Sequence, residues 1–312
     1  MGEPKRDLLL SGRAALPGRL GRFVLERFPP AAYGPLILAF VMCGYVGAAR
    51  ASGVAPQFDA RFLAVSLAMT LVFLRLRVTD ELKDAPLDRL GRPERPLPRG
   101  LVTRAELRAT AAVCVIGEVV LAVALGTPAL VAYGAALVYT RLSARDFFLG
   151  QHLHRRLVLY AFLHSPIVPL LLAVTWWAHP AARAGSALYG LLLLAWGVSL
   201  GLEVARKTVA PAEERPYVET YSGVLGQPRA VRLAAFALAT GCLGGAAYAA
   251  AVGAPAPGAP GMLGASLVVL LAGSAARHTR RLGALRAAAS ALGLALLLWP
   301  LLIVLLERRA GP

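Results

Sequence analysis

The 312 residues include 33 lysines and arginines against 17 acidic residues, and 57% of the chain is hydrophobic while only 16% is charged. This composition excludes an ordinary soluble globular protein, because apolar stretches close to the roughly 20 residues that span a bilayer recur along the chain. The net charge of +16 does not indicate a nucleic-acid partner, since the basic residues are divided among loops and form no patch interleaved with aromatic residues. We expect membrane lipids and anionic substrates as partners.

The apolar stretches predict an all-α, multi-pass membrane protein with nine transmembrane helices around a central cavity. In chain order, the predicted spans are 33–51, 61–77, 106–125, 128–143, 156–178, 185–205, 230–251, 260–276 and 284–306. Residues 1–32 contain six basic residues and no apolar run long enough for a signal peptide, so we expect a cytoplasmic N-terminal arm. The membrane domain is then residues 33–306.

The distribution of lysine and arginine predicts the orientation of these spans. With the N-terminus inside, the inner regions of the nine-span arrangement contain 28 of the 33 basic residues and the outer regions contain 5. Loops on the cytoplasmic side of a membrane are enriched in basic residues. We therefore predict a cell-membrane protein in which the loops at 75–108 and 206–232 both lie on the cytoplasmic side.

Carboxylates and arginines gather in the stretch from Asp80 to Gly100, DELKDAPLDRLGRPERPLPRG. Asp80, Asp84 and Asp88 recur every four residues, so they lie along one face if the preceding helix continues through them. Oxygen ligands favour Mg²⁺, which usually binds through one or two carboxylates and the phosphates of a substrate. A diphosphate site also needs guanidinium groups. The surrounding basic residues are Arg75, Arg77, Lys83, Arg89, Arg92, Arg95 and Arg99.

The alternative for this stretch is a solvated, charge-mixed loop between two helices, which is the commoner explanation of such spacing in a soluble protein. Here the mostly apolar run at 63–76 comes immediately before it. That position favours a metal and diphosphate site at a membrane surface.

A second group of charged residues follows the predicted sixth span. Glu203, Arg206 and Lys207 share one helix face at i, i+3 and i+4. The pattern alone fits an interfacial anchor equally well, with basic side chains reaching toward the headgroups. Because this group and the first one lie on the same predicted side, we interpret them as two halves of one site, facing each other over a shared apolar cavity.

With these residues in place, the chain resembles the UbiA superfamily of intramembrane prenyltransferases over essentially its whole length. That family's first motif runs NDxxDxxxD and ends in an RPLP-G tail. The motif positions correspond here to Asp80, Glu81, Asp84 and Asp88, and the tail to Arg95, Pro96, Leu97, Pro98 and Gly100. The second family motif, an aspartate-rich DxxxD stretch, is not kept, because residues 201–232 contain no aspartate. Thr220, Tyr221 and Gly226 keep the turn that follows it.

The resemblance implies a Mg²⁺-dependent transfer of a prenyl group from an allylic prenyl diphosphate to an aromatic or other lipid-soluble acceptor. It implies metal binding by Asp80, Glu81, Asp84, Asp88 and Glu203, with Glu213 or Glu214 as further candidates in the second motif. Arg206 and Lys207 then neutralise the diphosphate directly. The remaining residues expected at the substrates are Arg77, Lys83, Arg95, Tyr221 and His164.

Two other functions are compatible with parts of the pattern. A membrane terpene cyclase on the same scaffold ionises the same donor but folds the cation back onto its own chain. A transporter or binding protein for isoprenoid phosphates is disfavoured, because three carboxylates repel a phosphate unless a divalent metal intervenes. Prenyl chain length, acceptor and oligomeric state stay open.

Several polar or aromatic residues fall inside predicted spans. His164 is a functional candidate because a titratable group at membrane depth is rarely placed there without a role, although a bond to a neighbouring helix also explains it. Four aromatic residues are candidates to stabilise a carbocation, with ordinary packing as the commoner alternative; they are Tyr133, Tyr139, Tyr160 and Trp196. The three cysteines, Cys43, Cys114 and Cys242, are expected to be small core residues.

Overall fold

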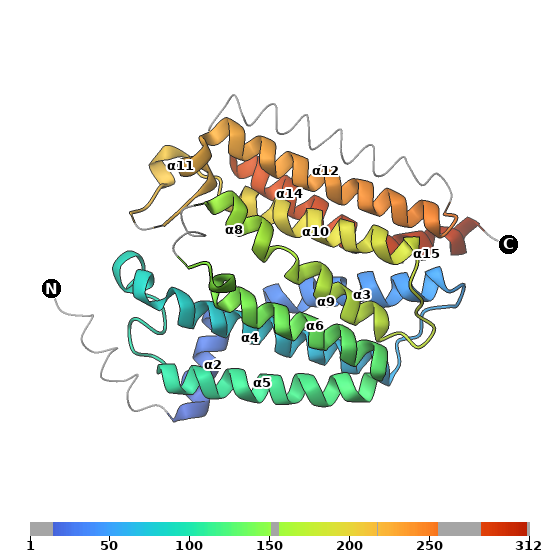
Figure 1. Ribbon diagram of the computed structural model, residues 1–312, viewed down its shortest axis with the longest axis horizontal. Coiled ribbons are helices and arrows are strands. Elements are labelled where there is room, and N and C mark those ends of the chain that lie inside the picture. Colours follow the sequence, from blue (N-terminus) through green and yellow to red (C-terminus); the bar gives the residue numbers. More distant parts are fainter. Residues whose placement is uncertain (1–14, 151–155, 217, 255–281, 311–312) are drawn as a thin grey trace.

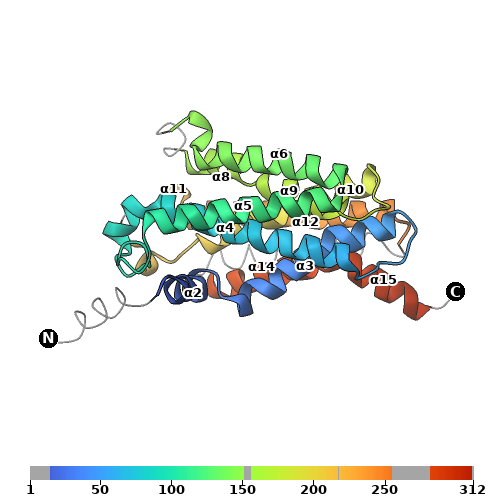
Figure 2. The same ribbon diagram turned by 90° about the horizontal axis from the view of Figure 1, so that it is seen from below.

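The computed structural model describes residues 15–150, 156–216, 218–254 and 282–310, and within these ranges the regular structure is entirely helical. Figures 1 and 2 show long helices running nearly parallel in a bundle, with the all-α architecture expected from the sequence. The helices are α2 Leu16–Arg27, α3 Pro30–Ala51, α4 Ala60–Gly91, α5 Arg104–Leu125, α6 Thr127–Ala144, η1 Asp146–Phe148, α8 Leu157–His164, α9 Ile167–Trp177, α10 Ser186–Arg206, η2 Pro211–Glu213, α11 Tyr221–Leu225, α12 Gln227–Ala251, α14 Leu282–Leu297 and α15 Trp299–Ala310.

Six of these helical segments are long and apolar enough to cross a membrane. A seventh is added if the bent pair Arg286–Leu297 and Trp299–Arg308, which meet at 57°, is one span. The predicted span at 260–276 lies outside the described residues, and the predicted span at 128–143 is the shorter helix α6. The chain is therefore a multi-pass helical membrane protein, while the count of nine spans stays a prediction.

Helix α4 is longer than a bilayer requires, and this length positions the charged residues. Its 32 residues extend about 48 Å at 1.5 Å per residue. A hydrocarbon core of about 30 Å uses roughly the first 20 of them, which end near Thr79. Asp59 caps the start of the helix, because its carboxylate accepts hydrogen bonds from the backbone N–H groups of Arg61 and Phe62. The segment from Asp80 onward therefore continues the same helix beyond the thickness of the apolar core.

Helices α10 and α12 approach each other closely because glycines line their contact. A Cβ atom at Gly197 would lie 2.3 Å from the backbone nitrogen of Gly241, and one at Gly244 would lie 2.3 Å from that of Leu194. Small residues of this kind let the backbones of membrane helices pack directly. The close packing holds the end of α10, which carries Glu203, in a fixed position.

Helix α2 packs on the bundle through both apolar and charged side chains. Phe23 is buried in a cluster with Val78 of α4 and Leu107 of α5. Arg19 pairs with Glu106 of α5, with 2.5 Å between Nη2 and Oε1. The described part of the N-terminal arm is therefore docked on α4 and α5, and residues 1–14 of the arm lie outside the described residues.

A buried ion pair joins α4, α5 and α6 within the membrane-spanning part of the bundle. Arg75 donates from Nε to both oxygens of Glu118, at 2.8 and 2.9 Å, and Tyr133 donates to Glu118 Oε2 at 2.9 Å. Thr140 accepts from Arg75 at 3.4 Å. Because each charged group has hydrogen-bonding partners, the network is tolerated at this depth and links three helices.

Candidate active site

The charged segments of α4 and α10 lie at the same end of the bundle. In Figures 1 and 2 the carboxyl end of α4 and the helix α11, which follows α10 in the chain, both lie at the left. The carboxylates of Asp80 and Glu203 are close enough for their charges to interact, and so are Asp80 and Arg206. Asp84 and Lys207 interact in the same way. The two predicted halves therefore face one another.

Two of the four acidic residues on α4 are exposed. Asp80 and Asp84 are solvent-accessible, and the Asp84 side chain is 53% exposed. They are four residues apart on a continuous helix, so they lie one above the other on its surface. No ion pair within the described residues reaches Asp80, and the nearest one at Asp84 is a distance of 3.9 Å to Arg95 Nη1. These two carboxylates are available to a ligand.

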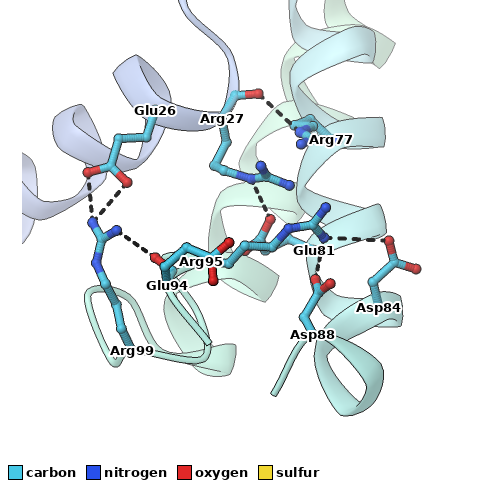
Figure 3. A network of polar contacts seen from close by, with 9 residues as sticks. All are labelled: Glu26, Arg27, Arg77, Glu81, Asp84, Asp88, Glu94, Arg95 and Arg99. Atoms are coloured by element: carbon cyan, nitrogen blue, oxygen red, sulfur yellow. Dashed lines mark hydrogen bonds and ion pairs between the residues drawn. The ribbon is translucent and has the colours of Figure 1, made fainter. Parts of the chain in front are cut away.

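The other two acidic residues of α4 are buried in ion pairs, which Figure 3 shows. Asp88 is bonded by Arg95 Nη1. Glu81 accepts from Arg27 Nε of α2 at 2.8 Å through Oε2, while its Oε1 is buried without a hydrogen-bond partner in the described chain. Arg77, another predicted substrate contact, donates from Nε to the backbone oxygen of Arg27 at 3.0 Å. This face of α4 therefore binds α2 and the following loop.

The loop after α4 folds back so that Arg95 reaches the helix it has just left. The Leu101 N–H donates to the Pro96 oxygen at 2.9 Å, and the Arg99 N–H donates to the Arg95 oxygen at 3.0 Å. Gly100 has a φ of +79°, a left-handed conformation that glycine adopts without strain. Leu101 is buried and anchors the end of the turn. The RPLP-G tail is thus a compact turn that presents Arg95 to Asp88 and Asp84.

At the end of α10, the one carboxylate is enclosed by cations of its own helix. Glu203 contacts Arg206 Nη2 at 2.6 Å and Lys207 Nζ at 2.8 Å. The side chain of Arg206 is exposed, and that of Lys207 is half-buried. The surplus charge at this end of the helix is positive.

The segment after α10 is held in place by hydrogen bonds, and these occupy two of its glutamates, Glu213 and Glu214. The Tyr221 N–H donates to the Lys207 oxygen at 3.0 Å, which fixes the start of α11 against the end of α10. Glu214 accepts from Thr220 Oγ1 at 2.7 Å and from Ser222 Oγ at 2.9 Å. Glu213 contacts Arg286 at 3.1 Å. Burial raises the pKa of the Tyr221 phenol, so this group stays protonated near the site.

Lys83, which lies between Asp80 and Asp84 in the sequence of α4, binds the segment after α6. Its Nζ lies 2.5 Å from Asp146 Oδ1 and 3.1 Å from the hydroxyl of Tyr160. Asp146 and the two residues after it, Phe147 and Phe148, all have positive φ angles between 49° and 60°. Such angles are uncommon for residues other than glycine, and residues held in strained conformations cluster at functional sites.

His164 packs against Tyr160 and so lies next to the group formed by Lys83, Asp146 and Tyr160. The two rings are stacked with centroids 3.8 Å apart. Its Nδ1 is 2.9 Å from the Tyr160 oxygen, and its Nε2 is 3.2 Å from the Ser143 oxygen. The histidine thus bonds the neighbouring helix α6 through Ser143, while its contact with an acceptor stays a prediction.

Three of the four aromatic candidates have a structural hydrogen bond in addition to their packing. Tyr133 bonds Glu118, the hydroxyl of Tyr139 donates to the Leu163 oxygen at 2.7 Å, and Trp196 donates to Ser165 Oγ at 2.8 Å. Tyr160 is the one of the four whose hydroxyl contacts Lys83. All three cysteines are buried and unpaired.

The fit to a divalent cation rests on Asp80 and Asp84. Among the residues that the structure describes, no three acidic, histidine or cysteine side chains stand close enough together to hold an ion by themselves. Two accessible carboxylates one helical turn apart, with cations opposite, suit an ion that also takes oxygen ligands from phosphates. The arrangement therefore fits Mg²⁺ bound jointly with a diphosphate.

Some residues of this end of the molecule carried no sequence signal. Arg27 lies 54 residues from its partner Glu81, and Asp146 lies 63 residues from Lys83. Neither belongs to a motif, and an isolated arginine or aspartate gives no indication of its partner. Only the fold identifies them.

Comparison with known proteins agrees with this architecture. The UbiA prenyltransferase family matches residues 38–299, so the chain belongs to that family. No curated protein matches the chain significantly.

Two solved structures share the fold. One is described as giving structural and mechanistic insights into the biosynthesis of digeranylgeranylglyceryl phosphate synthase in membranes. It is 16% identical with a TM-score of 0.63, and the alignment covers 92% of this chain and 98% of that one. The other is an apo UbiA homologue from Aeropyrum pernix K1, 18% identical with a TM-score of 0.59, covering 87% of this chain and 98% of that one.

Proposed function

We propose that the protein transfers a prenyl group from an allylic prenyl diphosphate to an aromatic or other lipid-soluble acceptor, with Mg²⁺ as cofactor. The observation that carries the proposal is that two accessible carboxylates on α4, Asp80 and Asp84, lie within range of electrostatic interaction with the cations Arg206 and Lys207 at the end of α10. Membership of a family of membrane prenyltransferases supports the reaction class. A site with both signs of charge at the end of an apolar bundle suits a substrate with a charged head and a hydrocarbon tail.

Asp80 and Asp84 would hold the cation, and Asp88 supports them through Arg95. When bound, the cation supplies Lewis-acid stabilisation of the diphosphate as it leaves. Arg206 and Lys207 bind the diphosphate oxygens on which negative charge increases, and such stabilisation is often the largest contribution to catalysis. Lys83, held by Asp146 and Tyr160, adds a further positive charge beside the carboxylates.

In the reaction, the bond between the prenyl carbon and the diphosphate oxygen breaks, and its electron pair leaves with the diphosphate. An electron-rich atom of the acceptor forms the new bond to the prenyl carbon and loses a proton. The apolar helices exclude water from the cationic prenyl group, so that the acceptor captures it.

Purified protein in nanodiscs tests this proposal. Diphosphate release and prenylated product are measured with prenyl diphosphates of several lengths and with a panel of aromatic and glycerol-phosphate acceptors. We expect product only with an acceptor, and release that is faster when the acceptor is present. Cyclised terpenes formed at full rate without any acceptor would assign the protein to the cyclases instead.

We also propose that the protein lies in the cell membrane with its site on the cytoplasmic side. Residues 1–32 would then be a cytoplasmic arm and residues 33–306 the membrane domain. The distribution of basic residues supports this orientation. Cysteines introduced at the exposed positions Glu94 and Gln57 test it in intact cells, because the native cysteines are buried. An impermeant thiol reagent should label Gln57→Cys and miss Glu94→Cys, and the opposite pattern would reverse the orientation.

A further inference from the structure

A lysine stands beside the two exposed carboxylates of α4, yet it is paired with neither of them. Lys83 follows Asp80 by three residues and directly precedes Asp84. Residues three apart on a helix are surface neighbours, and opposite charges at this spacing attract one another. The charge of Lys83 acts on both aspartates, but no ion pair among the described residues joins the lysine to either one. Its ammonium group is held elsewhere.

The segment after α6 holds this ammonium group. The Lys83 Nζ lies 2.5 Å from Asp146 Oδ1 and 3.1 Å from the hydroxyl of Tyr160. The side chains of Lys83 and Asp146 are 23% and 14% exposed, so water and salt screen the pair only in part. A lysine side chain is long and flexible, and its position therefore depends on partners of this kind.

The backbone at Asp146 has an uncommon conformation that its surroundings enforce. Asp146 and the two residues after it have φ angles between 49° and 60°, in the left-handed region that costs free energy for residues other than glycine. Such conformations persist where contacts over-determine them, and they cluster at functional sites. The ring of Phe147 packs edge-on against Tyr139 and His164, with centroids 5.4 Å apart in both pairs. This packing holds the turn from which Asp146 reaches Lys83.

We infer that Asp146 is a positioning residue that holds Lys83 away from Asp80 and Asp84, so that both carboxylates are open to a divalent cation. The inference rests on the metal site of the proposed function and adds a residue to it. Without the Asp146 charge, the lysine pairs with its helix neighbour Asp80, and a cation has to displace it. Asp146 acts on the site through Lys83 and not by binding the metal itself.

A second change at Lys83 distinguishes this role from two others. If Asp146 only kept the loop in shape, loss of its charge would weaken the metal site whether or not the lysine was present. If Lys83 itself bound the diphosphate, its removal would weaken the site as much as a change at Asp146. Only the role inferred here predicts that removing Lys83 restores what the Asp146 variant loses.

Electron paramagnetic resonance of Mn²⁺ with pyrophosphate, on the purified full chain in detergent, measures this without turnover. We expect Asp146→Asn to weaken Mn²⁺ binding about fivefold, which corresponds to the roughly 1 kcal/mol of a partly exposed ion pair. Lys83→Gln alone and Asp146→Asn/Lys83→Gln should both stay within about twofold of the parent protein, because neither leaves a free lysine charge beside Asp80. Asp146→Glu keeps the charge and should also stay close to the parent.

Glu307→Gln is the matched control. It breaks the ion pair of Glu307 with Arg50, which joins α15 to the end of α3 at the end of the bundle opposite α11 (Figure 1). That pair measures 2.7 Å, and its side chains are 29% and 25% exposed, so it resembles the pair at Lys83. Breaking it should change Mn²⁺ binding less than about twofold.

Tyr160→Phe provides an independent test, because it removes the other hydrogen bond to Lys83 and keeps the ring. It should weaken Mn²⁺ binding less than Asp146→Asn does, and Lys83→Gln should restore this loss too. Thermal unfolding of each variant shows which of them are folded, and the Tyr160 pair of variants decides the question if Asp146→Asn does not fold.

The outcomes separate this inference from the proposed reaction. Unchanged binding in Asp146→Asn, a loss that persists in the double variant, or an equal loss in Lys83→Gln would overturn the inference and leave the reaction standing. A parent protein that binds Mn²⁺ as expected but forms no prenylated product would contradict the proposed function and leave the role of Asp146 intact. A parent protein that binds no Mn²⁺ would overturn both.

Discussion

The ends of α4 and α10 both carry charged side chains to the same end of the bundle but use them differently. On α4, Asp80 and Asp84 are accessible while Glu81 and Asp88 are locked into ion pairs with arginines. On α10, Glu203 is bonded by two cations of its own helix. We propose a division of tasks, in which α4 supplies the carboxylates for a metal ion and α10 supplies positive charge for a diphosphate.

The division predicts the largest loss at α4. Asp84→Asn keeps the size and polarity of the side chain but removes the charge that would hold the metal, so turnover should fall by roughly 10²–10³-fold, the range found when one electrostatic group of an active site is removed. Glu203→Gln is the matched change on α10. Glu203→Gln should reduce turnover much less. Steady-state diphosphate release measures turnover in both variants. An equal loss would mean that α4 and α10 do not have different roles.

A variant of Glu81 tests whether this buried carboxylate of α4 stabilises the fold or binds the metal. Its removal leaves Arg27 largely buried without its partner, and breaking such a pair destabilises a protein by about 3–5 kcal/mol. We expect Glu81→Ala to lower the thermal unfolding temperature in detergent substantially. If the variant is as stable as the parent but inactive, Glu81 belongs with the metal ligands, as the family resemblance implied.

Arg206 and Lys207 sharpen the assignment for α10. Each side chain that donates to the diphosphate contributes a charge-assisted bond, so Arg206→Gln or Lys207→Gln should raise KM for the prenyl donor about tenfold. KM for the acceptor should stay unchanged. Arg229→Gln, an exposed arginine at the start of α12, is the control. Unchanged donor KM in both α10 variants would return this segment to the role of an interfacial anchor.

The smallest effect is expected at the exposed contact between α2 and the loop after α4. Although burial opposes it, Arg99 together with Arg22 holds the pKa of Glu26 below its usual range. The lowered pKa means that the contact stabilises the fold above the ordinary glutamate pKa and loses that contribution as the pH falls through the lowered value. Glu26→Gln should cost less than about 1 kcal/mol at neutral pH. A loss comparable with that of Glu81→Ala would mean that the contact is not an ordinary surface pair.

Sequence alone was sufficient for the family and for the all-α membrane architecture, because both depend on local patterns. The apolar runs predict spans, and the spacing of Asp80, Asp84 and Asp88 predicts one helix face once α4 is continuous. The sequence did not distinguish accessible from buried carboxylates. That distinction depends on Arg27 and Arg95, and the docking of α2 that brings Arg27 to Glu81 leaves no periodic pattern.

The second half-site shows the same limit. The spacing of Glu203, Arg206 and Lys207 correctly places them on one helix face. It does not predict the contacts of Glu213 and Glu214. Those two glutamates bond Arg286 and Thr220, contacts that form only when the loop before α11 is folded. The number of spans also stays undecided, because one predicted span lies outside the described residues.

Metal binding in the presence of diphosphate tests the division between α4 and α10 most directly. Electron paramagnetic resonance of Mn²⁺ added to the purified protein with pyrophosphate measures it without turnover. We predict bound Mn²⁺ in the parent protein and in Glu203→Gln, and loss of that signal in Asp80→Asn/Asp84→Asn. Loss of the signal in Glu203→Gln, with retention in the double aspartate variant, would contradict the account.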